Sequence, residues 1–383
     1  MRLSRCLRSQ NSIKNHFLQK IKFNGPITVS EYMKTCLYQP QLGFYSRNPL
    51  GRHGHFITSP EISSLFGEML GIWAARQWEL MGCPVPLTYV ELGPGRGLMC
   101  ADAINAFCKV TDVKISQIQI KLVEISEALK RIQKERIGSV LKSPENLNID
   151  WYNNIMNCDI KSPFFLFANE FFDAVPIHVF KKSTTRWLEV LVDVDDNDNF
   201  VFRHSPNITP SLSLVPEVFH GMSHLELSFE SGIMLLDIAK KLNNMQGTAL
   251  IVDYGHDDLN SSPDTFRAFR SHKQVNPLED PGECDLTADV NFAYFKHLLN
   301  TDNEHSVDTY GLVDQGDFLM QLGIHQRLED AMRTAPSAEK SQDILSAFKS
   351  ITSPQHMGSK FKVFSMQTRQ LPEPPGFVLD DSD

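Results

Sequence analysis

The chain of 383 residues is 42% hydrophobic and 22% charged, which is typical of a compact globular protein with one large domain or two. Its net charge of −9 argues against nucleic acid as a partner, because phosphate contacts require clustered lysine and arginine. No apolar run approaches the about 18 residues that predict a membrane span. Seven scattered cysteines without a Cys-x-x-Cys pair predict neither a disulfide framework nor a zinc site.

The start of the chain differs in charge from the rest. The first 30 residues carry six basic side chains and no acidic one. A start that contains arginine and serine and lacks acids is typical of a mitochondrial import signal, which we assign to residues 1–24. The alternative is a basic helix that touches a partner or a membrane surface.

Residues 25–86 are expected to form a helical lead-in to the main fold. Residues 27–47 predict a short helix that Thr28 or Ser30 would cap. A second helix is expected from Ser59, because serine is a favoured cap and Pro60 follows it in the first turn. Free N–H groups at this helix start could contact the carboxylate of a ligand at Ser59. Simple helix capping explains the same residues equally well.

Residues 87–97 read LTYVELGPGRG and form the most informative motif of the chain. The apolar run predicts a strand that ends near Glu91 and turns through Gly93, Gly95 and Gly97 into a helix. Such a turn leaves backbone N–H groups facing a crevice, with no Cβ atoms to block a ligand. The motif therefore predicts a site for a nucleoside-like cofactor, with a tight structural turn as the alternative.

The spacing of this motif separates two cofactor classes. The dinucleotide fingerprint requires glycine or alanine at its sixth position, where this chain has Leu98. An acid followed by three alternating glycines instead resembles the first motif of class I S-adenosylmethionine-dependent methyltransferases. This comparison favours S-adenosylmethionine over a nicotinamide cofactor.

The second half of the pocket is expected at the end of the next strand. After a helix predicted at 98–110, an apolar run at 118–126 contains the acid Glu124. A carboxylate at that place can accept both ribose hydroxyls of a cofactor. The alternative is an acid that caps the following helix. The interval from Gly97 to Glu124 exceeds the roughly 20 residues of the dinucleotide case, which again disfavours a nicotinamide cofactor.

The remaining pattern alternates strands and helices and predicts an α/β fold. Expected elements are strands at 146–152 and 164–173, a hairpin from 186–194 and 199–204, a loop at 204–217, a helix at 230–244, a strand at 248–255, an irregular excursion to about residue 289, a helix, and a strand at 360–367. We therefore expect one domain over 25–370 with its core starting at residue 87. Insertions are expected at about 185–225 and 256–290, and residues 371–383 are expected to be disordered.

Several sequence blocks carry a family resemblance. They are GPITVSEYM, FITSPEISSLFGEMLGIW, YVELGPGRG, LVEIS, ANEFFDAVP, VDYGH, DTFRAF and DLTADVNF, in this order over roughly residues 25–300. In these blocks the chain resembles the MidA-like family of mitochondrial protein arginine methyltransferases, assembly factors for respiratory complex I. The resemblance implies a class I methyltransferase fold, which is Rossmann-like with a mostly parallel sheet and helices on both faces. It also implies S-adenosyl-L-methionine as cofactor, a location in the mitochondrial matrix, and symmetric dimethylation of an arginine on a complex I core subunit.

Arginine methylation requires a group that holds a cation, because the guanidinium has a pKa above about 12 and is a poor nucleophile. A pair of carboxylates can bind two of its nitrogens in a forked geometry and leave the third nitrogen to react. Glu170 is therefore expected to hold the guanidinium, with Asp173 as its partner, at the end of the apolar strand at 164–173. Phe171 and Phe172 would wall the site. The alternative makes Asp173 a helix cap and both phenylalanines core residues.

Two further groups are less specific. His256 follows the strand at 248–255 and could accept the released proton near neutral pH, although a histidine that only packs in the core is equally consistent with the pattern. Asp285 and Asp289 could bind a basic peptide or start a helix.

Three functions from different classes remain open at this stage. The first is a protein arginine methyltransferase that acts on a protein substrate. The second is a non-catalytic assembly chaperone with the methyltransferase fold, and the third is an NAD-dependent oxidoreductase. The third is weakened by Leu98 and by the lack of a Ser/Tyr-x-x-x-Lys signature for hydride transfer.

Overall fold

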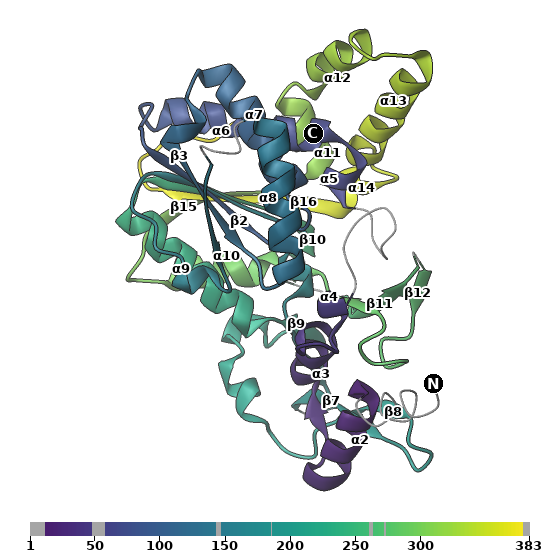
Figure 1. Cartoon of the computed structure of the whole chain (residues 1–383). Helices are drawn as coiled ribbons and strands as arrows, with labels where there is room; N and C mark the ends of the chain where they lie inside the picture. The colour runs from purple at the N-terminus through teal and green to yellow at the C-terminus, as the bar shows by residue number, and fades with distance from the viewer. Residues whose placement is uncertain are drawn as a thin grey trace. The chain divides into compact units, whose positions relative to one another are not determined.

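The computed structural model of the chain describes residues 12–47, 58–142, 147–184, 186–259, 263–271 and 273–377. The chain divides into two compact units (Figure 1). Unit 1 comprises residues 1–56, 173–232 and 257–294, and unit 2 comprises residues 57–172, 233–256 and 295–383. The two expected insertions thus lie in unit 1 together with the first part of the N-terminal lead-in, whereas residues 57–86 of that lead-in belong to unit 2. The sequence instead predicts one domain over 25–370.

Unit 2 is built on a twisted sheet with strand order β15-β16-β10-β5-β2-β3-β4. From β10 to β4 all neighbouring strands run parallel, whereas β16 runs antiparallel to both of its neighbours. The strands are β2 (Leu87–Leu92), β3 (Ile118–Val123), β4 (Asn148–Tyr152), β5 (Phe164–Asn169), β10 (Gly247–His256), β15 (Val307–Asp314) and β16 (Phe361–Thr368). Because β2 and β5 are buried along their whole length, they read as continuous apolar runs with few exceptions.

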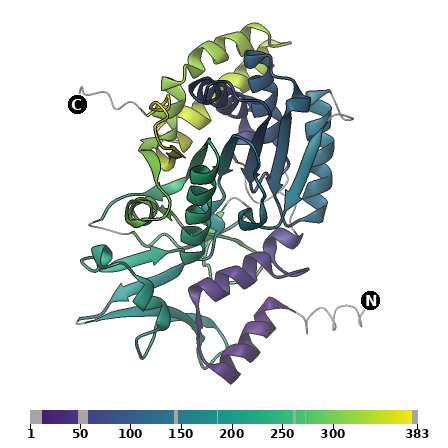
Figure 2. The ribbon, with the colours of Figure 1, turned by 90° about the vertical axis from the view of Figure 1, so that its left-hand side faces the viewer.

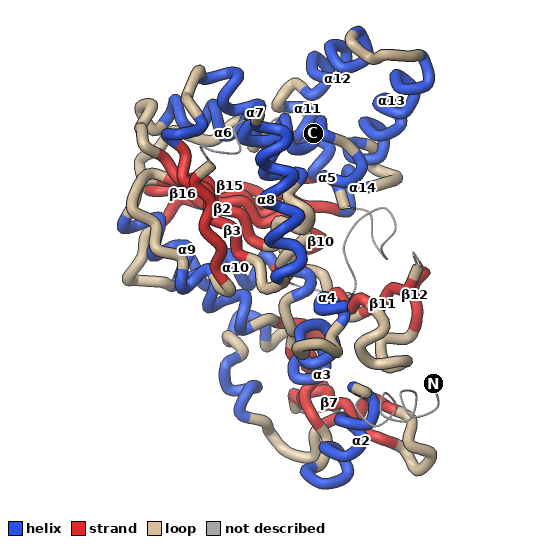
Figure 3. The backbone as a smooth tube through the Cα atoms, in the orientation of Figure 1, coloured by secondary structure: helices blue, strands red, loops and turns tan. Residues whose placement is uncertain are grey.

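Helices cover both faces of this sheet (Figure 3), which confirms the predicted methyltransferase-type α/β architecture. The helices α9 and α10 begin in unit 1 and continue into unit 2. The helices are α5 (Ser59–Ile62), α6 (Ser64–Leu80), α7 (Leu98–Thr111), α8 (Glu127–Leu141), α9 (Phe229–Asn244), α10 (Phe292–Thr301), α11 (Gln315–Gln321), α12 (Ile324–Arg333), α13 (Ala338–Thr352) and α14 (Met357–Lys360).

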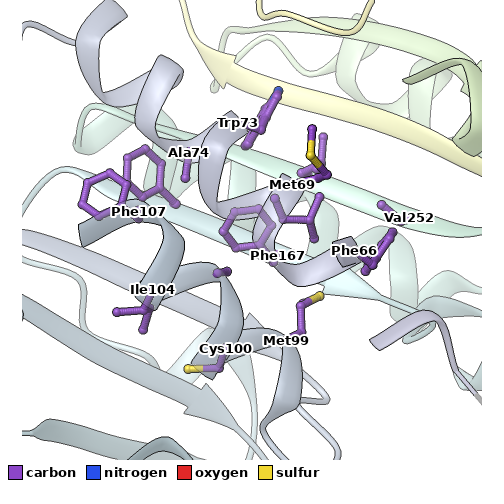
Figure 4. Close-up of a cluster of buried hydrophobic side chains, with 14 of the residues drawn as sticks. Phe66, Met69, Trp73, Ala74, Met99, Cys100, Ile104, Phe107, Phe167 and Val252 are labelled. Carbon is purple, nitrogen blue, oxygen red and sulfur yellow. The ribbon is translucent and has the colours of Figure 1, made fainter. Parts of the chain in front are cut away.

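The core of unit 2 lies where α6 and α7 pack on the sheet (Figure 4). Trp73 of α6 meets Phe167 of β5 edge-on at a ring separation of 5.9 Å, and Phe107 of α7 meets Phe165 at 5.7 Å. The two helices can approach closely because residue 71 is a glycine. A Cβ atom at this position would overlap the carbonyl oxygen of Ala103. This packing fixes the start of α7, and therefore the glycine turn that precedes it.

Unit 1 contains a small antiparallel sheet of order β1-β7-β6-β9, with β8 paired to β7. The predicted hairpin at 186–204 is confirmed as the β7–β8 pair. Figure 2 shows the N-terminal helices of this unit in purple beside its teal strands. The elements are α2 (Ile13–Asn24), β1 (Ile27–Thr28), α3 (Val29–Tyr38), α4 (Phe44–Arg47), β6 (His178–Lys182), β7 (Trp187–Val194), β8 (Phe200–His204), β9 (His224–Leu227), β11 (Arg267–Arg270), β12 (Lys273–Val275), β13 (Asp285–Thr287) and β14 (Val290–Asn291).

The helix α2 falls inside the segment expected to be an import signal. Ser12 caps it by accepting the N–H of Asn15 at 3.2 Å, and Ile13, Phe17 and Ile21 are buried at intervals of four residues. The ring of Phe17 stacks on that of Tyr32 at 5.0 Å. Residues 13–24 are therefore an integral helix of unit 1, so the expected boundary at residue 24 does not match the structure. The first eleven residues lie outside the described part of the chain.

Other expectations about elements need correction. The helix expected from Ser59 is two helices, because Ser63 is extended and caps α6 through the N–H of Leu65 at 3.1 Å. The excursion expected at 256–289 contains the sheet β12-β11-β13, and the expected loop at 204–217 contains short 3-10 turns. Between residues 302 and 360 the sequence reading omitted β15 and the helices from α11 to α14.

The C-terminal tail was expected to be disordered, and residues 371–377 contradict this. The carbonyl oxygen of Pro375 accepts the indole N–H of Trp73 at 3.2 Å, and Phe377 is only 5% exposed and packs on Phe318. Residues 378–383 lie outside the described part. Among the residues that the structure describes, no helix has the length and apolar character needed to cross a membrane.

Candidate active site

The strand order of unit 2 places a ligand site at one edge of its sheet. From β2 the chain continues to β3 and β4 on one side, and later to β5 and β10 on the other side. In open parallel sheets ligands bind at the carboxyl ends of the strands, where the order reverses. The glycine turn follows β2, Glu124 follows β3, Glu170 follows β5, and His256 ends β10. The structure therefore gathers at this edge residues that lie far apart in the sequence.

The glycine turn after β2 adopts a backbone that ordinary residues avoid. Gly93, Gly95 and Gly97 have φ values of 63°, 52° and 76°, all in the left-handed region. A Cβ atom at Gly93 would lie 2.9 Å from Cδ2 of Phe171. Gly97 is the N-cap of α7 and offers no side chain to the first N–H groups of that helix. This bare main chain at a helix start fits the amino-acid and ribose parts of a nucleoside cofactor.

Glu91 lies within β2, just before this turn, and is buried. It is 2% exposed, and its carboxylate accepts the hydroxyl of Tyr89 at 2.7 Å. Burial raises the pKa of Glu91 to about 8, although the hydrogen bond from Tyr89 lowers it. Glu91 and Tyr89 share one face of β2 because they are two residues apart. A role for Glu91 as a direct cofactor ligand stays a prediction, and the hydrogen bond seen for its carboxylate is to Tyr89 of the same strand.

Glu124 lies directly after β3 and is 8% exposed. Its Oε1 accepts the N–H of Ser126 at 2.8 Å, and its Oε2 accepts the amide of Gln133 at 3.2 Å. Burial raises the pKa of Glu124, while these hydrogen bonds lower it. The N-cap of α8 is Ser126, which accepts the N–H of Leu129. Glu124 thus contacts the start of α8 through the N–H of Ser126, while Ser126 itself is the N-cap. Ribose binding stays the prediction for this carboxylate.

Glu170 has a strained backbone at the end of β5. Its φ of 50° lies in the left-handed region, which residues other than glycine rarely adopt. Its Oε1 accepts the backbone N–H of Ser59 at 2.9 Å and the side-chain amide of Asn169 at 3.2 Å. Such strain is common at functional sites, where the surrounding structure holds the residue in place.

Asp253 on β10 holds the turn that contains Glu170. It is fully buried, and its Oδ2 accepts the N–H groups of Phe171 at 3.1 Å and Phe172 at 2.8 Å. The backbone N–H of Glu170 donates to the carbonyl of Val252 at 2.9 Å. The sequence block VDYGH contains Asp253, but from the sequence we expected a functional role, acceptance of the released proton, only for His256. The signal that could have found it is a lone acid at the end of a buried apolar strand.

The other predicted site residues of unit 2 are placed as follows. The N–H of Ser59, which we expected to face a ligand, donates to Glu170, and the Ser59 hydroxyl lies 3.7 Å from Sδ of Met357. His256 is the last residue of β10 and is half-buried. Phe172 is buried against Phe295, which agrees with the alternative that Phe172 is a core residue.

Asp173 belongs to unit 1, where it is buried and interacts with Arg267, Asp285 and Asp289. Burial raises the pKa of Asp173 to about 7; Arg267 lowers it and Asp289 raises it. The pKa of Asp285 is likewise raised to about 7 by burial and by Asp173, and its Oδ1 accepts the hydroxyl of Tyr45 at 2.9 Å. The expected pairing of Asp173 with a guanidinium holder stays a prediction.

Unit 1 also brings together ligand-type atoms of His224, Glu226 and Asp264, within 4.8 Å of one another. Protein groups already engage these carboxylates. Glu226 accepts the N–H of Thr265 at 3.0 Å, and Asp264 pairs with Lys181 at 2.8 Å. The arrangement is therefore explained as an ion-pair and hydrogen-bond network of the sheet edge.

Comparison with known proteins agrees with this geometry. The model of a family described as "Putative S-adenosyl-L-methionine-dependent methyltransferase" matches residues 69–312. The chain is similar to the proteins named "Protein arginine methyltransferase NDUFAF7, mitochondrial" of Danio rerio (37% identity, 93% of this chain, 86% of that protein) and of Homo sapiens (36%, 93% and 83%). It is also similar to the homolog of Drosophila melanogaster (36%, 95% and 86%).

A solved structure gives the same fold. It is a superfamily member from Burkholderia thailandensis bound to S-adenosyl-homocysteine, with a TM-score of 0.80, 22% identity, and coverage of 95% of this chain and 93% of that chain. The nicotinamide alternative has no support from these relatives, and the cofactor of this chain is S-adenosyl-L-methionine. The chain belongs to the family of S-adenosyl-L-methionine-dependent methyltransferases that includes the NDUFAF7 proteins.

Proposed function

We propose that this chain is a protein arginine methyltransferase of the mitochondrial matrix that forms symmetric dimethylarginine on a core subunit of respiratory complex I. Two findings support the proposal. The relatives named as mitochondrial protein arginine methyltransferases match nearly the whole chain at 35–37% identity. The acidic character of the chain, with a net charge of −9, suits a basic peptide as substrate.

The observation that carries the proposal is the placement of Glu170. It follows β5, the strand next to β2 in the sheet, so its carboxylate belongs to the edge that also holds the glycine turn. The Ser59 N–H and the Asn169 amide hold Oε1 of this carboxylate, and its backbone is held in the left-handed region. A fixed carboxylate beside a methyl donor is what binding of a guanidinium requires.

When it is bound, S-adenosyl-L-methionine supplies an electrophilic methyl group on a sulfonium. The backbone of Gly93, Gly95 and Gly97 would hold its amino-acid part, and Glu124 its ribose hydroxyls. We assign Glu170 to the guanidinium, which it orients so that one nitrogen faces the methyl group. Alignment of this kind can supply on the order of 7–11 kcal/mol of the barrier.

Proton removal completes the transfer, because the methylated guanidinium nitrogen loses a proton. We assign acceptance of this proton to the Glu170 carboxylate or to His256, which ends β10, the strand paired with β5. Asp173 is proposed as the second carboxylate that orients the cation. General-base groups of this kind contribute about 10²–10⁴-fold to rate.

The test replaces Glu170 with glutamine. The Glu170→Gln variant keeps an oxygen that can accept the Ser59 N–H, but it removes the charge that holds the cation. We expect methyl transfer to fall by at least about 100-fold while the affinity for S-adenosyl-homocysteine, measured by calorimetry, stays near that of wild type. Transfer is measured with radiolabelled cofactor on matrix proteins from cells that lack this enzyme, followed by mass spectrometry for a new dimethylarginine.

Glu127→Gln is the matched control, because Glu127 is an exposed acid on α8. It should transfer methyl groups at the wild-type rate. Full turnover by Glu170→Gln would remove Glu170 from the reaction. If wild type labels no matrix protein, and a Gly95→Val variant that cannot bind cofactor still restores complex I assembly in depleted cells, the protein is an assembly chaperone.

A further inference from the structure

The side chain of Gln133 connects two separate parts of the cofactor site. Gln133 lies on α8 and is completely buried. Its Nε2 donates to the carbonyl oxygen of Gly95 at 2.8 Å and to Oε2 of Glu124 at 3.2 Å. One amide group therefore joins the glycine turn after β2 to the acid after β3.

A third contact determines how this amide is oriented. The indole Nε1 of Trp151 on β4 donates to Oε1 of Gln133 at 2.8 Å. An indole N–H can only donate and a backbone carbonyl can only accept. With the amide turned over, the indole would face an NH₂ group, and the Gly95 carbonyl and the Glu124 carboxylate would face an oxygen. The network therefore allows only one orientation of the Gln133 amide.

The backbone of α8 also supports the turn directly. A Cβ atom at Gly97 would lie 3.2 Å from Cα of Gln133, which is tighter than an ordinary van der Waals contact. The turn and the first half of α8 are thus in direct contact on the side where the Gln133 amide reaches Gly95. A change at residue 133 acts on the turn and on Glu124 together.

We propose that Gln133 is a positioning residue for cofactor binding. Its amide satisfies the carbonyl of Gly95, so the turn keeps the conformation that presents N–H groups to the cofactor. Its second N–H fixes the carboxylate of Glu124 in the rotamer that meets the ribose hydroxyls. Gln133 therefore acts on the cofactor only through Gly95 and Glu124. The hydrogen bond from Trp151 fixes the orientation of the Gln133 amide.

The first experiment separates positioning from simple core packing. Gln133→Leu has a similar volume and removes both donors. We expect its affinity for S-adenosyl-homocysteine, measured by calorimetry well below the melting temperature, to fall by about tenfold or more, because two hydrogen bonds that preorganise the site are lost. Ile137→Ala is the matched control, because Ile137 is a buried core residue one turn further along α8.

Ile137→Ala should lower the melting temperature of the unliganded protein while leaving the affinity for S-adenosyl-homocysteine unchanged. Wild-type affinity in Gln133→Leu would overturn the proposal. The proposal would also fail if Gln133→Leu and Ile137→Ala lost the same affinity and the same thermal stability. That result would mean that Gln133 only packs in the core. These readouts measure binding and do not depend on which acceptor is methylated, so they stand apart from the test of Glu170.

The second experiment asks whether Gln133 acts through Glu124. Glu124→Gln and Gln133→Leu are combined, and the affinity for S-adenosyl-homocysteine is measured for each variant. We expect the double variant to lose less affinity than the product of the two single losses, because both changes disturb the same contact. Trp151→Phe, which removes the indole N–H and keeps an aromatic ring, should reduce affinity by about threefold. If the affinity losses of Glu124→Gln and Gln133→Leu multiply in the double variant, and Trp151→Phe binds like wild type, Gln133 does not act through Glu124.

Discussion

At the scale of single residues, the site depends on groups whose properties are set by burial. Glu91 is the strongest case, since burial raises its pKa to about 8 from the 4.5 of an exposed glutamic acid. The folded state therefore holds a proton that the unfolded chain releases at lower pH. The stability that this proton contributes is complete below about pH 4.5 and is lost as the pH rises through about 8.

The Glu91→Gln variant tests this directly. Glutamine is neutral at every pH and keeps an oxygen that can accept the Tyr89 hydroxyl. We expect the variant to lose less stability than wild type between pH 5 and pH 8, measured as the midpoint of urea unfolding at each pH. Glu127→Gln, which changes an exposed acid, should follow the wild-type pH profile. A pH profile for Glu91→Gln that is parallel to wild type would show that Glu91 is ionised in the folded protein.

Gly93 carries a second residue-scale prediction. Gly93→Ala places a Cβ atom in the left-handed region and 2.9 Å from the Phe171 ring. Gly82→Ala is the matched control, because Gly82 also has a positive φ, of 83°, but no atom lies within 4 Å of the position that its new methyl group would take. We expect a loss of about 1 kcal/mol for Gly82→Ala and about 2–3 kcal/mol for Gly93→Ala.

Thermal unfolding and calorimetry with S-adenosyl-homocysteine measure both variants. Only Gly93→Ala should also weaken binding of S-adenosyl-homocysteine, because only its methyl group lies in the glycine turn and clashes with the Phe171 ring. Equal behaviour of the two variants would mean that the Phe171 ring moves away at no cost and that the turn tolerates a side chain.

At the scale of elements, α2 shows how one helix can satisfy two different sequence patterns. Its basic, acid-free character is typical of an import signal, yet its apolar face packs on α3 and β8 residues of unit 1. Phe17 is fully buried, whereas Phe23 near the end of the same helix is 90% exposed. The two phenylalanines therefore provide an internal comparison of packing.

Phe17→Ala should destabilise the protein by about 3–5 kcal/mol, because it leaves a cavity beside Tyr32 and Phe200. Phe23→Ala should change stability by less than about 0.5 kcal/mol. Urea unfolding followed by circular dichroism measures both. Wild-type stability of Phe17→Ala would show that α2 is not part of the folded core.

At the scale of the whole molecule, the glycine turn, Glu124 and Glu170 all belong to the first stretch of unit 2, residues 57–172. They are held at one sheet edge by the parallel register of β3, β2 and β5. Binding of one ligand should therefore protect peptides from three distant parts of the sequence at once.

Hydrogen exchange measures this. With S-adenosyl-homocysteine at about 100 times its dissociation constant, stability should rise by about 2.7 kcal/mol. Slower exchange is expected in peptides that contain residues 93–98, 124–133 and 169–172, and no change is expected in α12 and α13. Protection confined to the glycine turn would show that Glu124 does not belong to the cofactor site and that the end of β5, which carries Glu170, does not lie beside it.

The sequence by itself determined the elements whose signal is local. The glycine turn, the apolar strands around it and the β7–β8 hairpin are readable because their conformation depends on neighbouring residues. The family blocks then gave the fold class and the cofactor. The sequence reading missed β15, which is half-buried with a bulge between Tyr310 and Val313, and the strands of three or four residues in β11 to β13. Edge strands and very short strands lack the periodicity that reveals buried ones.

Only the tertiary structure decided which side chains act together. Ser59 and Glu170 meet across 111 positions, and Asp253 reaches back to the N–H groups of Phe171 and Phe172 across more than 80. Nothing in the helix EALKRIQKER marks Gln133 as different from its polar neighbours, because its role depends on partners from three other segments. The physical reason is that hydrogen-bond partners are set by strand order and register, which local sequence patterns do not encode.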